Sequence, residues 1–85
     1  DPLEARLTDV LLRFDGTVLE LFDRGVSGSA RYHREFMPGL KLESGVLTVN
    51  NPDQTYRVYS YSAEQEPALE ALVAAALAAG GSGAA

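Results

Sequence analysis

The feature that most constrains the fold is residues 62–80, the stretch with the periodicity of an α-helix. Its apolar residues recur at the i, i+3, i+4, i+7 and i+8 spacing of one helix face. They are Leu69, Leu72, Val73, Ala76 and Leu77. The residues before this stretch alternate or turn as they do in a β-sheet, and a sheet with one apolar face needs a cover. We therefore predict an α+β domain, mainly β, whose sheet is covered by a C-terminal helix.

The start of this helix has two alternatives. Ser62 and Gln65 have the spacing of a capping box, which places the start at Ser62. Pro67 conflicts with that start, because at the fifth helical position it removes a hydrogen bond and crowds the preceding turn. Either the first turn is distorted or the regular helix begins near Glu66. The pair Gly80-Gly81 is expected to end the helix, and residues 81–85 are expected to be loose.

Residues 8–23 give the strongest local signal, which is that of a β-hairpin. Residues 8–14 and 17–23 each alternate in polarity, and between them lies Asp15-Gly16, which is favoured in two-residue hairpin loops because both positions tolerate positive φ. The inner face is predicted to carry Val10, Leu12, Leu19 and Leu21. The outer face is then left with Leu11, Val18 and Phe22.

The rest of the chain predicts further short strands separated by turns. Residues 30–36 alternate as an extended strand, with Tyr32, Arg34 and Phe36 on one face. Further strands are predicted at residues 40–43, 46–50 and 55–61, with turns at residues 37–39, 44–45 and 51–54. The sheet therefore spans residues 8–61 of a single domain over residues 1–85. Residues 1–7 form either a short helical turn with Pro2 at its first position or a frayed end.

Size and charge exclude several classes of function. A chain of 85 residues buries only about 60–65% of its unfolded surface, so its core is thin. The net charge of −5 weighs against nucleic acid and anionic lipid, since both need a basic footprint. No apolar run reaches the roughly 20 residues of a membrane span. Abundant alanine and arginine are typical of a GC-rich bacterial genome. We also expect a soluble, cytoplasmic protein.

No catalytic constellation, metal site or cofactor site is predicted. His33 is the single histidine, and a catalytic base needs a partner that orients it. The chain has no cysteine, and its carboxylates are scattered, so no metal-ligand set stands out. We therefore expect that the protein is not an enzyme.

Two surfaces are candidates for binding. The segment from Arg24 to Lys41 is locally positive, so Arg31, His33, Arg34 and Lys41 form a candidate anion site. The alternative is that these charges are solvated singly or paired with Glu20 and Glu35.

The second candidate is an exposed apolar surface on the sheet. Alternation puts Tyr56 on the face opposite Tyr59 and Tyr61, so at least one tyrosine is expected outside. The candidate interaction surface consists of Leu11, Val18, Phe22, Tyr59 and Tyr61. Exposed apolar groups suit a protein interface. The alternative is that loops and the N-terminal segment shield them.

The order of elements resembles a small bacterial PH-like domain. The similarity covers about residues 7–79, from the hairpin around Phe14-Asp15-Gly16, through the irregular strand of residues 31–36 and two more short strands, to the closing helix. It implies a bent antiparallel β-sandwich or part-open barrel of five to seven strands, closed by the helix. Eukaryotic members bind phosphoinositides through a basic loop between their first two strands. Asp15-Gly16 is too short and has no Lys or Arg, so phosphoinositide binding is not expected.

The function expected from these features is noncatalytic interaction. The PH-like resemblance implies an interaction or assembly module. We expect a protein partner or a second copy of the chain, bound through an open strand edge or the outer sheet face. The alternative is an anion- or small-ligand-binding module that uses the basic segment.

Overall fold

The computed structural model describes residues 1–80, which form two antiparallel sheets followed by an α-helix. The four-stranded sheet has the order β1 (Leu3–Arg6), β2 (Val10–Phe14), β3 (Val18–Asp23), β4 (Ala30–His33). The three-stranded sheet has the order β5 (Gly39–Glu43), β6 (Val46–Asn50), β7 (Tyr56–Ser60). The 3-10 helix η1 (Arg34–Phe36) lies between the sheets in sequence, and α1 (Glu66–Ala79) follows β7. The predicted class, α+β and mainly β, is confirmed.

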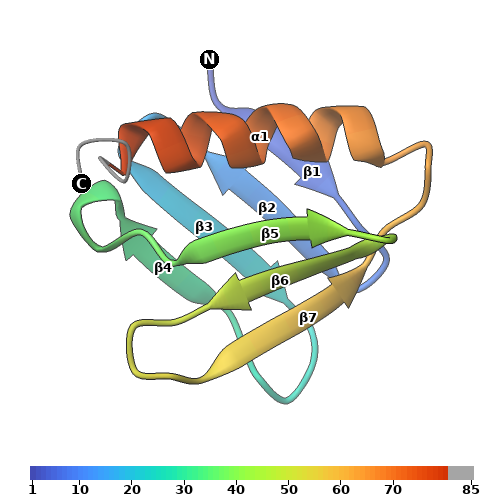
Figure 1. Cartoon of the computed structure of the whole chain (residues 1–85), viewed down its shortest axis with the longest axis horizontal. Helices are drawn as coiled ribbons and strands as arrows, with labels where there is room; N and C mark the ends of the chain where they lie inside the picture. The colour runs from blue at the N-terminus through green and yellow to red at the C-terminus, as the bar shows by residue number, and fades with distance from the viewer. Residues whose placement is uncertain (81–85) are drawn as a thin grey trace.

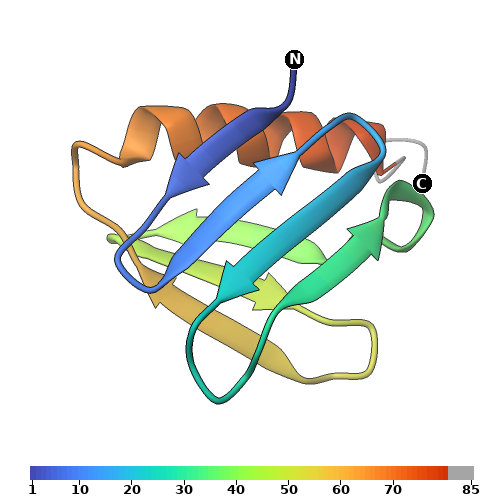
Figure 2. The same ribbon diagram turned by 180° about the vertical axis from the view of Figure 1, so that it is seen from behind.

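The two sheets and the helix share one buried core. Figures 1 and 2 show the sheets as two layers, with α1 lying along one side of both. The helix packs chiefly on β1 and also contacts β5 and β2. The fully buried large side chains come from all three parts: Leu12, Leu19, Leu21, Leu47, Val49, Leu69 and Leu72. The predicted inner face of residues 8–23 and the predicted helix face are therefore confirmed, with Leu77 only partly buried.

The β2–β3 hairpin forms as predicted, but its loop lies one residue further along the chain. The Asp15 N–H donates to the Val18 carbonyl at 3.3 Å, so the two central residues are Gly16 and Thr17. Gly16 alone among the loop residues has a positive φ, of 99°. One Asp15 carboxylate oxygen accepts from the N–H groups of Thr17 and Val18, each at 2.8 Å. Asp15 precedes the two central residues, and its carboxylate therefore stabilises the turn by hydrogen bonds to their side of the loop.

The regular helix begins at Glu66, which is the second of the two predicted alternatives. Pro67 occupies the first turn, where its missing N–H has no intrahelical partner to lose. The Gln65 side chain still accepts a hydrogen bond from the Ser62 N–H at 2.8 Å, which is one half of the predicted capping box. The residues expected to form a loose tail, 81–85, lie outside the described part of the chain.

Gly80 follows the helix in a right-handed conformation, with φ −67°, so it is not a left-handed cap. Its role is close packing. A Cβ at this position would lie 2.8 Å from the Cβ of Met37. Glycine therefore lets the end of α1 approach the segment that leads into β5.

Two predicted elements are wrong. The N-terminal segment is neither a helical turn nor a frayed end, because Leu3–Arg6 forms β1 and pairs with β2. The alternation typical of a strand is present in this segment but short, since Ala5 is buried and its neighbours on β1 are exposed. The strand predicted at residues 30–36 ends at His33, where η1 begins. Arg34 and Phe36 therefore do not share a strand face with Tyr32, and Phe36 is 70% exposed.

None of the helices in residues 1–80 combines the length and the apolar character that a membrane crossing requires.

Candidate functional site

The outer face of the four-stranded sheet carries side chains in rows that run across the strands. One row places Glu4, Arg13, Glu20 and Arg31 opposite one another on β1, β2, β3 and β4. Their charges alternate. Glu4 and Arg13 approach to 3.9 Å, and Glu20 and Arg31 approach to 3.3 Å. This row is internally neutralised, so it offers no net charge to a partner.

The neighbouring row is different, because it combines apolar groups with an uncompensated cation. Arg6 on β1 lies opposite Leu11 on β2, and Leu11 lies opposite Phe22 on β3. Leu11 is half-buried and Phe22 is 43% exposed. Arg24 follows at the end of β3 and is also exposed. Within residues 1–80, neither Arg6 nor Arg24 has an ion pair.

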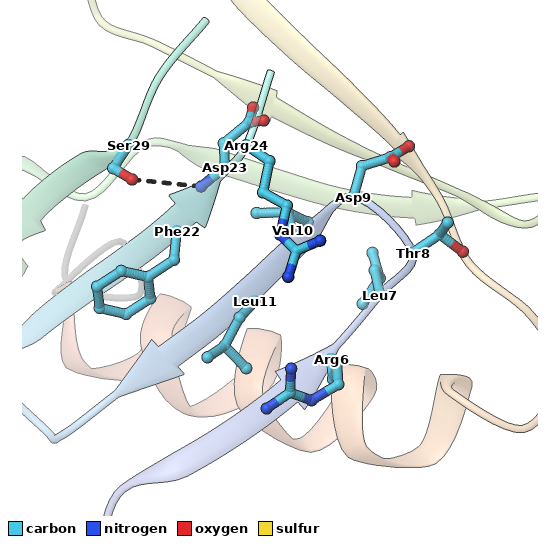
Figure 3. Close-up of a pocket in the computed structure, with 10 residues that line it drawn as sticks. All are labelled: Arg6, Leu7, Thr8, Asp9, Val10, Leu11, Phe22, Asp23, Arg24 and Ser29. Carbon is cyan, nitrogen blue, oxygen red and sulfur yellow. Dashed lines mark hydrogen bonds between the residues drawn. The ribbon is translucent and has the colours of Figure 1, made fainter.

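These four residues border a shallow pocket of about 430 Å³ (Figure 3). Its walls come from the end of β1, the β1–β2 connection, strands β2 and β3, and the two ends of the β3–β4 loop. The complete lining is Arg6, Leu7, Thr8, Asp9, Val10, Leu11, Phe22, Asp23, Arg24 and Ser29. We call Arg6, Leu11, Phe22 and Arg24 the outer-face site. Chemically it offers an apolar surface beside two guanidinium groups, each with several free donors.

Beside this pocket, three polar side chains connect the two sheets. The Tyr59 hydroxyl on β7 donates to Asp23 Oδ2 at 2.6 Å, and Arg57 Nη1 lies 3.5 Å from the same oxygen. Arg57 also donates to the carbonyl oxygens of Gly28 at 2.6 Å and Ser27 at 3.2 Å. We call Asp23, Arg57 and Tyr59 the polar clasp. It fixes the β3–β4 loop, and with it the pocket wall, against β7.

The clasp shifts the pKa values of its members in directions that follow from these contacts. The hydrogen bond from Tyr59, and next the Gly25 N–H, lower the pKa of Asp23. Burial raises the pKa of Tyr59. The Arg57 pKa is raised, first by its hydrogen bond to Tyr59. The clasp is therefore a charged Asp–Arg pair with a neutral tyrosine at neutral pH.

The predicted interaction surface is brought together only in part. Leu11 and Phe22 are direct neighbours on the outer face, as predicted, and Val18 lies on the same face beyond the charged row. Tyr59 was wrongly placed there: it is 9% exposed, because its ring faces the core and its hydroxyl reaches Asp23. Tyr61 is partly buried against the core. The large apolar side chains that β7 exposes are instead Tyr56 and Val58.

The four residues of the candidate anion site are not brought together. Arg31 and His33 lie on the outer face of the four-stranded sheet, whereas Lys41 lies on the outer face of the three-stranded sheet. Arg31 pairs with Glu20, and Lys41 pairs with Glu43 at 3.3 Å. The His33 ring accepts the Glu35 N–H and so caps η1, whose first residue is Arg34. The alternative, charges that are paired or solvated singly, describes this segment better.

Sequence reasoning missed Arg6, because the N-terminal segment was not expected to be a strand. The alternation of Leu3, Ala5 and Leu7 with Glu4 and Arg6 was the available signal. It spans one short strand, so it was too weak to decide between a strand and a turn. Arg24 was recognised as basic, but its place beside Phe22 depends on the path of the β3–β4 loop.

Residues 1–80 contain no group of three or more His, Cys, Asp or Glu side chains that could hold a metal ion. Comparison of the chain with protein-family models, with curated proteins and with solved structures found no significant match. The case for a function therefore rests on the geometry of the chain's own residues.

Proposed function

We propose that this chain is a noncatalytic protein-interaction domain of PH-like type, which binds its partner through the outer-face site. The observation that carries the proposal is the pairing of Leu11 with Phe22 on the outer side of the sheet, at the edge of a pocket. An aromatic side chain that is 43% exposed offers apolar area that the fold leaves in contact with water. Partly exposed aromatic groups beside arginine are typical of the anchors of protein interfaces.

The PH-like part of the proposal is supported by the order of the elements. Four antiparallel strands, then three, then a C-terminal helix agree with the resemblance seen in the sequence. In this arrangement the connection between the first two strands is Leu7-Thr8-Asp9, not Asp15-Gly16. Like Asp15-Gly16, it carries no Lys or Arg, so we do not propose phosphoinositide binding through that loop.

Affinity capture with matched variants tests the proposed function. Phe22→Ser removes the apolar anchor without touching the core, and Val58→Ser makes a similar change on β7, outside the outer-face site. We expect the unchanged domain and Val58→Ser to retain the same protein, and Phe22→Ser to lose it. Truncating such an anchor weakens binding by about tenfold or more. Circular dichroism of both variants checks that they fold. Equal retention of the partner by the unchanged domain and by both variants would contradict the proposal.

Self-association through β7 is the second candidate. β7 is an edge strand on the side of its sheet that α1 does not cover, and Tyr56 and Val58 expose 67% and 56% of their area. Unpaired edges accept a further strand, including that of a second copy. Sedimentation over a range of concentrations should show dimers that Val58→Lys removes and Ala71→Lys, on the exposed helix face, does not. A monomer at all concentrations would eliminate this candidate.

A further inference from the structure

We infer that the partner's binding segment is an acidic protein segment with an apolar anchor, held by Arg6 and Arg24 beside the Leu11–Phe22 pair (Figure 3). This inference rests on the proposed protein-binding function and names the chemistry of the partner. Its basis is the unequal distribution of charge on one face of the sheet.

The fold pairs some arginines of this face with carboxylates and leaves others without an ion pair in the described part of the chain. Arg13 and Arg31 each have a carboxylate within 4 Å, supplied by Glu4 and Glu20 in the same row. Arg6, one row away, lies opposite Leu11 instead of an acid. The chain has twelve acidic residues against seven basic ones, so two unpaired arginines at one pocket are not explained by a shortage of carboxylates.

Two carboxylates, those of Asp9 and Asp23, line the same pocket. Asp23 is occupied by Tyr59 and by the Gly25 N–H, which donates to it at 2.6 Å. Asp9 lines the pocket but makes no ion pair among residues 1–80, and Figure 3 shows its carboxylate directed away from Leu11 and Phe22. Neither acid forms an ion pair with Arg6 or Arg24. A carboxylate from a partner can therefore form the pairs that the fold does not supply.

The spacing of the strands sets the distance between the apolar contact and the charged contact. Arg6, Leu11 and Phe22 lie on consecutive strands, and neighbouring strands are about 4.8 Å apart. Phe22 and Arg6 are thus separated by roughly 10 Å across the sheet, which equals about three residues of extended chain. An extended segment that crosses the strands can place an apolar side chain against Phe22 and an acidic side chain, about three residues away, against Arg6.

Net charge favours a protein segment over an anionic membrane. A membrane presents negative charge over a wide area, and a domain with a net charge of −5 is repelled by it. An acidic segment a few residues long is attracted mainly by the groups within a Debye length, which is about 8 Å at physiological ionic strength. The apolar pair beside the arginines also matches a side chain better than a phosphate.

Selection of binders from a library of random linear peptides tests this inference without assuming a sequence. We expect selected peptides to carry Asp or Glu about three residues from a leucine, methionine or aromatic residue. For one such peptide, the double variant Arg6→Gln, Arg24→Gln should bind about tenfold more weakly, the combined effect of two partly exposed charge pairs. Arg13→Gln, on the same face but already paired with Glu4, should stay within about twofold.

The outcomes separate the two proposals. Selected peptides that need Phe22 but show no acidic preference, or that bind the double variant equally well, would overturn this inference and leave the proposed function standing. Failure to select any peptide would overturn this inference, and binding that Phe22→Ser leaves unchanged would overturn both. A further measurement uses vesicles of phosphatidylcholine and phosphatidylglycerol. Cosedimentation with them that requires Arg6 and Arg24, in the absence of peptide binding, would assign the site to an anionic membrane instead.

Discussion

The hydroxyl of Tyr59 donates a 2.6 Å hydrogen bond to Oδ2 of Asp23, which joins the three-stranded sheet to the end of β3 in the four-stranded sheet. The Asp23 side chain is only 7% exposed, so water is a poor substitute for this donor. Tyr59→Phe keeps the ring in the core and removes the donor alone. We expect it to lower the free energy of unfolding by about 1–2 kcal/mol.

Urea denaturation of Tyr59→Phe measures this effect, and Tyr56→Phe is the matched control. Tyr56 lies on the same strand but is 67% exposed, and its loss of a hydroxyl should change stability by less than about 0.5 kcal/mol. Equal effects in the two variants would mean that the Tyr59–Asp23 bond contributes nothing to stability.

Arg57→Lys should loosen the β3–β4 loop. The planar guanidinium reaches the carbonyl oxygens of both Ser27 and Gly28, and a lysine ammonium cannot hold both in that geometry. Amide exchange of Gly28, whose N–H bonds to the Gly25 carbonyl, should accelerate by about tenfold or more, since bonds to a charged group are worth about 1.5–3 kcal/mol. Arg13→Lys, on the outer face, should leave this rate unchanged. An unaltered Gly28 rate would show that the clasp does not hold the loop.

Stability should fall in acid, with the polar clasp as one cause. Hydrogen bonds lower the folded-state pKa values of Asp15, Asp23 and Asp53. The unfolded chain therefore binds more protons in acid than the folded one. This stabilisation is complete above the ordinary aspartate pKa of about 3.9 and is lost as the pH falls through the lower folded values. Urea midpoints measured from about pH 6 to about pH 2 should decline, and Asp23→Asn should make the decline shallower. A urea midpoint that does not change with pH would contradict the stabilising role given to these aspartates.

Stability should also fall at alkaline pH, and we expect the ionisation of Tyr59 to be the cause. Burial raises its folded-state pKa above the ordinary value of about 10, so the folded form keeps the phenol proton longer than the unfolded form does. The associated stabilisation is complete below that ordinary value and is lost as the pH rises through the higher folded value. Tyrosinate absorbance should show one late-titrating group that Tyr59→Phe removes and Tyr56→Phe retains. Loss of the late titration in Tyr56→Phe would refute this.

Leu72→Ala should cost about 2–5 kcal/mol, because Leu72 is fully buried on the face of α1 that packs against the sheets. Glu70→Ala, on the exposed side of the same helix, should stay within about 0.5 kcal/mol. Chemical denaturation of the two variants compares them directly. Similar losses would show that the apolar face of α1 does not carry the packing described above.

Local patterns in the sequence were sufficient for most strands and for the helix. Alternation in residues 8–23 predicted both the hairpin and the burial of Leu12, Leu19 and Leu21, because successive side chains on a strand point to opposite faces. The residues predicted as a strand at 46–50 are those of β6. The helix was similarly determined by its 3.6-residue period, since an apolar stripe of this width must face a core.

Tertiary structure alone decided which groups meet. The sequence shows that Tyr56 and Tyr59 lie on opposite faces of β7 but not which face is buried; that depends on the sheet packed against it. The position of Arg6 beside Leu11 depends on strand pairing, and the bond from Arg57 to Gly28 joins residues 29 positions apart. Side-chain periodicity is a local property, so the sequence determines it directly. Register and loop position are set by contacts between distant segments, and these exist only once the two sheets have packed together.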